Sequence, residues 1–230
     1  MGLYDRNYTT GSANTSAEFA AQQDTALVRF VKTTYMFFGA SLFFAFIGAM
    51  IGFYNLEVVV ENRMLILIAE IAALFGLMFS RSKPGLNIAM LFIFTTLTGL
   101  AITPLVAVVA LKAGAGAVAS AFAMATIVFG VMSIVGIRTK KDLASMGKML
   151  FIALIVVVIG SIVNLFLGST MFQVLISSAA VLLFSGYVAY DTQNIIRGLY
   201  TSPVDAAISL YLDFYNLFVA LLSLLGLSRD

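Results

Sequence analysis

Apolar residues along this chain gather into long blocks that are separated by short polar connections. Seven such blocks can be distinguished, at residues 30–54, 64–80, 86–111, 115–137, 148–168, 171–196 and 204–227. Their length suits the roughly 20 residues that an α-helix needs to cross the hydrocarbon core of a bilayer. The pattern predicts an all-α integral membrane protein whose domain at residues 30–230 contains about seven transmembrane helices.

Composition supports this prediction and narrows the chemistry. Hydrophobic residues make up 61% of the 230 residues and charged residues only 10%, whereas a soluble domain carries roughly 25% charged residues. The chain has no cysteine and no histidine, which excludes disulfides, zinc sites with Cys or His ligands, and catalysis by a Ser-His or Cys-His pair. A net charge of +2 gives no basic footprint for nucleic acid.

The first 29 residues are polar and lack the apolar core of a signal peptide. We expect residues 1–29 to form a mobile tail or a short surface helix. With seven spans, ten of the 13 basic residues fall on the side of this tail, and only Arg63, Lys112 and Arg229 fall on the other. Because cytoplasmic loops carry an excess of lysine and arginine, the N-terminus is predicted to be cytoplasmic. The C-terminus then lies outside, unless the last segment is re-entrant.

Small residues and one proline shape the predicted helices. Gly48 and Gly52 are four residues apart, a spacing that allows two helices to approach closely. Pro104 interrupts the block at 86–111, because proline lacks a backbone N–H and kinks a helix. Pro104 is therefore either a hinge that exposes carbonyl groups to a cavity or a residue that only shapes packing.

Three acidic residues lie inside the apolar blocks: Glu70, Asp191 and Asp213. Ionisable groups within spans are costly and mark candidate functional sites. Asp191 lies eight residues before Leu199 and Asp213 eight residues after Asp205, on either side of one predicted turn. In an antiparallel hairpin, both aspartates then lie roughly 12 Å from the turn. The sequence predicts equal depth for this pair but not whether the two side chains face each other.

Two carboxyl groups that meet in a dry site share a proton rather than both ionising, and their titration is coupled. Such a pair can latch two helices together and release them when both groups ionise. It can also offer oxygen ligands to calcium, with Asn194 and Asn216 as further oxygen donors, each three residues after an aspartate. The alternative is that each aspartate only caps or hydrogen-bonds a neighbouring helix.

Glu70 is expected near the outer interface, where it reaches water. Arg81, at the end of the second block, either extends to the interface or pairs with an aspartate of the hairpin. Ser202, Pro203 and Asp205 have the pattern of a capped helix start. The basic run at 138–148 favours contact with anionic lipid.

Four segments together resemble the Bax inhibitor-1 family, also called the transmembrane BAX inhibitor motif family. They are GLAITPLV (99–106), TKKDLASMGKML (139–150), FSGYVAYDTQNII (184–196) and LYLDFYNLFVALLSLLG (210–226). The resemblance implies six helices around a central C-terminal seventh and a pH-sensitive calcium leak. It also implies that Asp191 and Asp213 form the pH sensor and that Arg81 engages one of them. The lysine-rich C-terminal tail of some members is absent, and Glu70 has no place in the family pattern.

Three functions follow as hypotheses. The first is a pH-gated calcium leak with no resident cofactor, in which calcium passes or transiently binds Asp191 and Asp213. The second is an interaction protein that binds another membrane protein, such as a membrane-bound protease, through the polar tail. The third is an intramembrane aspartyl protease, which the flanking residues YDTQ and LDFY disfavour. The leading expectation is therefore a protein that is not an enzyme.

Overall fold

The structure, a computed structural model, describes the backbone of residues 6–227 and the side chains of residues 22–227. Within this range the chain is helical and contains no strand. The elements are α1 (Arg6–Tyr54), α2 (Leu56–Glu61), α3 (Arg63–Phe79), α4 (Leu86–Ala113), α5 (Ala115–Arg138), the short 3₁₀ helix η1 (Leu143–Met146), α6 (Gly147–Leu167), α7 (Thr170–Ile196) and α8 (Pro203–Leu227).

The predicted all-α membrane architecture is confirmed, whereas the count of seven spans is not. Each predicted block corresponds to one helix whose ends lie within a few residues of the prediction, except that α1 begins at Arg6, well before the first block. Among the described residues, six helices are long and apolar enough to cross a membrane. Of the helices that match predicted blocks, α3 is outside that group, because its 17 residues fall short of the roughly 20 that a span needs.

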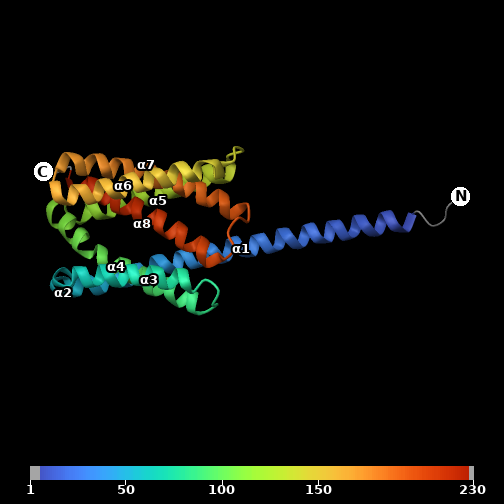
Figure 1. Cartoon of the computed structure of the whole chain (residues 1–230), viewed down its shortest axis with the longest axis horizontal. Coiled ribbons are helices and arrows are strands. Elements are labelled where there is room, and N and C mark those ends of the chain that lie inside the picture. The colour runs from blue at the N-terminus through green and yellow to red at the C-terminus, as the bar shows by residue number, and fades with distance from the viewer. Residues whose placement is uncertain (1–5, 228–230) are drawn as a thin grey trace.

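Helix α1 runs without a break from Arg6 to Tyr54, so the boundary expected at residue 29 is not a structural boundary. Residues 6–29 continue the first spanning helix and project beyond the other helices (Figure 1). The stretch 12–38 contains no glycine and no proline, the two residues that most disfavour helix interiors. Nothing in its sequence therefore interrupts the helix where polar residues give way to apolar ones.

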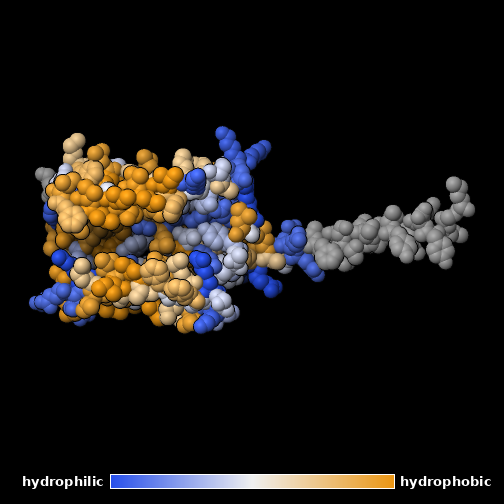
Figure 2. All heavy atoms as spheres, in the orientation of Figure 1, coloured by the Kyte–Doolittle hydropathy of each residue, from blue (hydrophilic) through white to orange (hydrophobic). Residues whose placement is uncertain are grey.

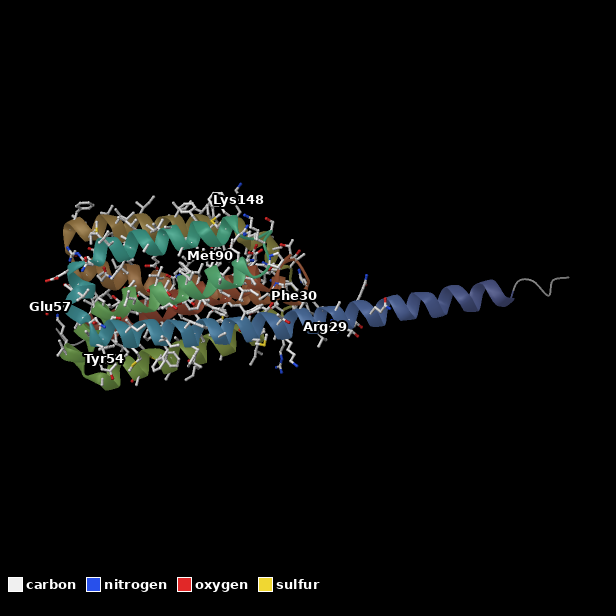
Figure 3. The ribbon with its side chains drawn as sticks, turned by 90° about the horizontal axis from the view of Figure 1, so that it is seen from below. Arg29, Phe30, Tyr54, Glu57, Met90 and Lys148 are labelled. Atoms are coloured by element: carbon white, nitrogen blue, oxygen red, sulfur yellow. The ribbon has the colours of Figure 1, made fainter. Side chains whose placement is uncertain are left out.

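The bundle has two ends, which we name by α1. Arg29 and Phe30 mark the tail end, where α1 enters the bundle, and Tyr54 and Glu57 mark the far end (Figure 3). The connections α3–α4, α5–α6 and α7–α8 lie at the tail end, and α4–α5 and α6–α7 at the far end (Figure 1). Figure 2 shows apolar side chains along the bundle and hydrophilic ones at its ends, as a bilayer-spanning protein requires.

Helix α8 is the centre of the bundle. It contacts α1, α4, α5 and α7, while α3 packs on α4 and α6 packs on α7. Its side chains Leu210, Tyr211, Leu217 and Leu222 are completely buried. The central position implied for the last helix is therefore observed, with four helices rather than six in direct backbone contact with it among the described residues.

The crossing of α1 and α4 depends on glycine. A Cβ atom on Gly48 would lie 2.0 Å from the carbonyl oxygen of Thr96, and one on Gly99 would lie 1.9 Å from that of Ala45. Gly52 is similarly close to a side chain of α4. The prediction of close approach at Gly48 and Gly52 is confirmed, because only residues without a side chain let the two backbones come so near.

Candidate functional site

Asp191 of α7 and Asp213 of α8 lie side by side in the tail-end half of the bundle. Both are buried, with exposed fractions of 6% and 4%, and their carboxyl groups are near neighbours that interact directly. The antiparallel α7–α8 hairpin places them at matching depth, and the rotation of the two helices turns them toward each other. The tertiary structure thus supplies the orientation that the sequence left open.

The two carboxyl groups have unequal surroundings. Asp191 has the Tyr200 hydroxyl and Asn194 as neighbours, two groups that can donate to a carboxylate. Asp213 Oδ2 is buried and meets no hydrogen-bond donor of the described residues. Burial, and then the charge of Asp191, raises the pKa of Tyr200, so this tyrosine stays a neutral donor. Asp191 therefore has polar neighbours that can donate hydrogen bonds, whereas Asp213 Oδ2 has none among the described residues.

A cavity of about 680 Å³ adjoins the pair, between α6, α7 and α8. Near the pair its polar lining includes Ser209 and Asn216, and further along α7 and α8 it includes Gln173, Ser177 and Ser223. Figure 2 shows a hollow with more hydrophilic atoms in it, between the layer of α6 and α7 and the layer of α3 and α4. Polar side chains inside a membrane-spanning bundle usually face such a cavity, since lipid offers no hydrogen bonds.

The two asparagines expected beside the pair take different positions. Asn194 contacts Asp191 and faces a separate small cavity with Tyr200. Asn216 lines the main cavity, where its Nδ2 donates to the carbonyl oxygen of Leu212 at 2.7 Å. Only Asn216 therefore offers its side chain to an ion inside the main cavity.

Arg81 does not engage the pair, contrary to the implied role. Its Nε lies 3.2 Å from Asp205 Oδ1, although the N–H bond is not directed at that oxygen. Asp205 lies in the first turn of α8, whereas Asp213 lies eight residues deeper, roughly 12 Å along the helix. Ser202 caps α8, since its Oγ accepts from the Val204 N–H at 3.1 Å. Asp205 is thus used for the ion pair and not for a capping box.

Pro104 does not break α4, which is helical from Leu86 to Ala113. This corrects the expected interruption, because the neighbouring turns keep their helical bonds around the missing N–H. Glu70 of α3 is half-buried and lines a cavity of about 260 Å³ together with Pro104 and Arg63. Neither residue belongs to the cavity next to the aspartate pair.

Sequence reasoning missed Gln193, which is only 1% exposed. Its Oε1 accepts from the Leu143 N–H at 2.7 Å, and its Nε2 donates to the carbonyl oxygens of Thr139 and Lys141 at 3.2 and 3.0 Å. These bonds attach the α5–α6 connection to α7, two residues from Asp191. A glutamine inside an apolar block was the available signal.

Metal-binding capacity at the pair is modest. No group of three or more Asp, Glu, His or Cys side chains suited to a metal occurs among the described residues. Calcium takes six to eight oxygen ligands, so two carboxylates alone do not form a complete site.

The chain is similar to other bacterial proteins over most or all of its length. It is 57% identical to a protein of Helicobacter pylori over 100% of this chain and 99% of that one. It is 34% identical to a membrane protein of Vibrio cholerae over 87% of this chain and 90% of the relative. It is 37% identical to the Escherichia coli protein named modulator of FtsH protease YccA, over 71% of this chain and 77% of the relative.

Residues 27–230 match the model of the family described as inhibitor of apoptosis-promoting Bax1. This match includes α1 from residue 27 onward, all the later spanning helices, the α7–α8 hairpin and both aspartates. The chain is therefore an integral membrane protein that belongs to the Bax inhibitor-1 family.

Proposed function

We propose that this protein is a pH-sensitive calcium leak of the bacterial inner membrane. The observation that carries the proposal is the contact between Asp191 and Asp213 beside a cavity with polar lining. Acidic side chains attract divalent cations, and polar groups inside a spanning bundle mark ion and proton pathways. The basic residues at the tail end support a cytoplasmic position for the pair.

The shared proton acts as the latch. With one proton, Asp213 donates to Asp191, and the two helices α7 and α8 are held together. When both groups ionise, the like charges repel each other, the α7–α8 contact loosens, and two carboxylates become available to calcium. Protonation therefore closes the leak and ionisation opens it.

Calcium flux into liposomes that hold the purified protein, scanned from about pH 5 to pH 8, tests this function. We expect flux to rise with pH, and Asp213→Asn or Asp191→Asn to flatten that dependence. Asp24→Asn is the matched control, since Asp24 is an exposed acid on α1 and its loss leaves flux unchanged. Flux no greater than in empty liposomes at every pH contradicts the proposal.

A second function is favoured by one relative. The Escherichia coli protein is named a modulator of FtsH protease, which suggests that this chain also binds a membrane-bound protease. Helix α1 is the candidate binding segment, because it projects beyond the bundle at the tail end (Figure 1).

Deletion of residues 2–21 tests this second function, because it leaves the span Gln22–Tyr54 intact. We expect the shortened protein to lose co-purification with the protease from detergent-solubilised membranes while calcium flux persists. Equal recovery of the protease with the full and shortened chains counts against a role of the projecting helix.

A further inference from the structure

A second polar cluster lies at the same cavity, toward the far end of the bundle. Gln173, Ser177 and Ser223 line the cavity, and Asn164 is bonded to Gln173. The cluster consists of four uncharged side chains from three helices: Asn164 of α6, Gln173 and Ser177 of α7, and Ser223 of α8. Asn164 Nδ2 donates to Gln173 Oε1 at 2.8 Å. Gln173 Nε2 donates to Ser177 Oγ at 3.3 Å and to Ser223 Oγ at 3.2 Å, and the two serine hydroxyls are 3.3 Å apart.

The cluster is anchored to the backbone of the α6–α7 turn. Asn164 Oδ1 accepts from the Ser169 N–H at 3.1 Å, and Gly168 turns the chain with φ of +60°. Asn164 and Ser177 are buried. Gln173 therefore bridges a rigid turn on one side and α8 on the other, and it crosses the space between α6, α7 and α8.

Two of the helices that carry this cluster, α7 and α8, also carry the aspartate pair. Gln173, Ser177 and Asp191 all line the cavity from α7, and Asp213 and Ser223 line it from α8. Ser223 lies ten residues after Asp213, which is roughly 15 Å along the helix. The wall between them is mostly apolar and includes Ala180, Phe184 and Ala220. The cavity thus has an acidic end, an apolar middle and an uncharged polar end.

We propose that the Asn164–Gln173–Ser177–Ser223 cluster closes the far end of this cavity as a second gate that does not respond to pH. The proposal rests on the function given above, in which the cavity carries ions. Amide and hydroxyl groups keep the same charge from pH 5 to pH 8. The four side chains are hydrogen-bonded to one another. A hydrated ion can therefore pass only after these hydrogen bonds break and the side chains bond to the water around the ion instead.

The absence of cysteine from the sequence allows a direct test of closure. Ala220→Cys places one thiol in the cavity wall, and a membrane-impermeant thiol reagent is added from the far side of oriented proteoliposomes. We expect slow labelling in this variant and labelling at least tenfold faster when Gln173→Ala is added. Thr170→Cys, at an exposed position at the start of α7, is the control that labels rapidly in both backgrounds.

A second variant and two contrary outcomes complete the test of the second gate. If Gln173→Ala fails to fold, Ser223→Ala takes its place, because it removes one hydroxyl of the cluster with little change in volume. We expect Ser223→Ala to speed the labelling of Ala220→Cys. Rapid labelling of Ala220→Cys alone, or labelling that neither Gln173→Ala nor Ser223→Ala accelerates, overturns the second gate and leaves the cluster a purely structural contact.

Calcium flux separates the two proposals. Gln173→Ala is expected to raise flux at every pH without moving the pH midpoint, whereas Asp213→Asn flattens the pH dependence. Absence of flux in all variants contradicts the calcium leak, while the labelling rates still decide whether the cluster closes the cavity.

Discussion

Arg81, just after α3, and Asp205, in the first turn of α8, form an ion pair across the tail end of the bundle. The pair matters because α3 otherwise packs on α4 and α2. It is thus a direct electrostatic connection between the peripheral helix α3 and the central helix α8. The Arg81 side chain is 56% exposed and that of Asp205 only 12%, so solvent weakens the attraction.

We expect Arg81→Gln and Asp205→Asn to be non-additive. A largely exposed ion pair is worth about 0.2–1 kcal/mol, and a double-mutant cycle on unfolding in detergent isolates that coupling. Lys83→Gln is the control, since Lys83 is exposed in the same connection. Strictly additive losses of stability in the double variant would show that the two charges do not interact.

Tyr200→Phe is expected to move the pH midpoint of calcium flux upward. The Tyr200 hydroxyl is a neighbour of Asp191, and a hydroxyl that donates to a carboxylate favours its ionised form. Without that donor, the shared proton is retained to higher pH, so the leak opens later in a rising pH scan. The flux assay over about pH 5 to 8 measures this shift, and a midpoint that falls instead contradicts the assigned hydrogen bond.

Gln193→Leu is expected to loosen the α5–α6 connection. The substitution leaves the Leu143 N–H and two carbonyl groups without their partners, and each buried polar group left unpaired costs about 1–3 kcal/mol. Amide hydrogen exchange at Leu143 is therefore expected to accelerate markedly. Ser161→Ala is the control, because the Ser161 hydroxyl bonds only to Val157 of its own helix among the described residues. Unchanged exchange at Leu143 would contradict the proposed attachment.

Gly99→Ala and Gly39→Ala test the α1–α4 crossing. A Cβ on Gly99 would lie 1.9 Å from the backbone oxygen of Ala45, whereas one on Gly39 meets nothing within 4 Å. We expect Gly99→Ala to lower the yield of folded protein severely and Gly39→Ala to leave it unchanged or slightly higher, since alanine is the better helix former. Size-exclusion chromatography in detergent measures both, and equal behaviour of the two variants would refute the close crossing.

Asp142 gives a stability effect with a defined pH range. The backbone N–H of Ala144, followed by the charge of Arg197, lowers the pKa of Asp142, which outweighs the opposing effect of desolvation. A lowered folded pKa contributes stability above the ordinary value near 4, and that contribution is lost as pH falls through the folded pKa. Asp142→Asn is therefore expected to melt slightly earlier than the wild type at pH 7 and equally at about pH 2. If the difference in melting temperature between the wild type and Asp142→Asn grows as the pH falls, this prediction is wrong.

The sequence alone predicted the helices, because spanning segments are defined by local composition. Each block must supply enough apolar surface for lipid and must satisfy its own backbone, and both conditions are readable within about 20 residues. The equal depth of Asp191 and Asp213 could also be predicted, since it depends only on the rise per residue along two helices joined by a turn.

Tertiary structure alone decided which side chains meet. Rotation of α7 and α8 about their axes turns Asp191 toward Asp213, and the position of α3 directs Arg81 to Asp205 rather than to the pair. The Gln173 cluster likewise joins residues up to 59 positions apart in the chain, from Asn164 to Ser223. Such contacts result from how ridges and small residues of several helices pack together, and no local pattern encodes that packing.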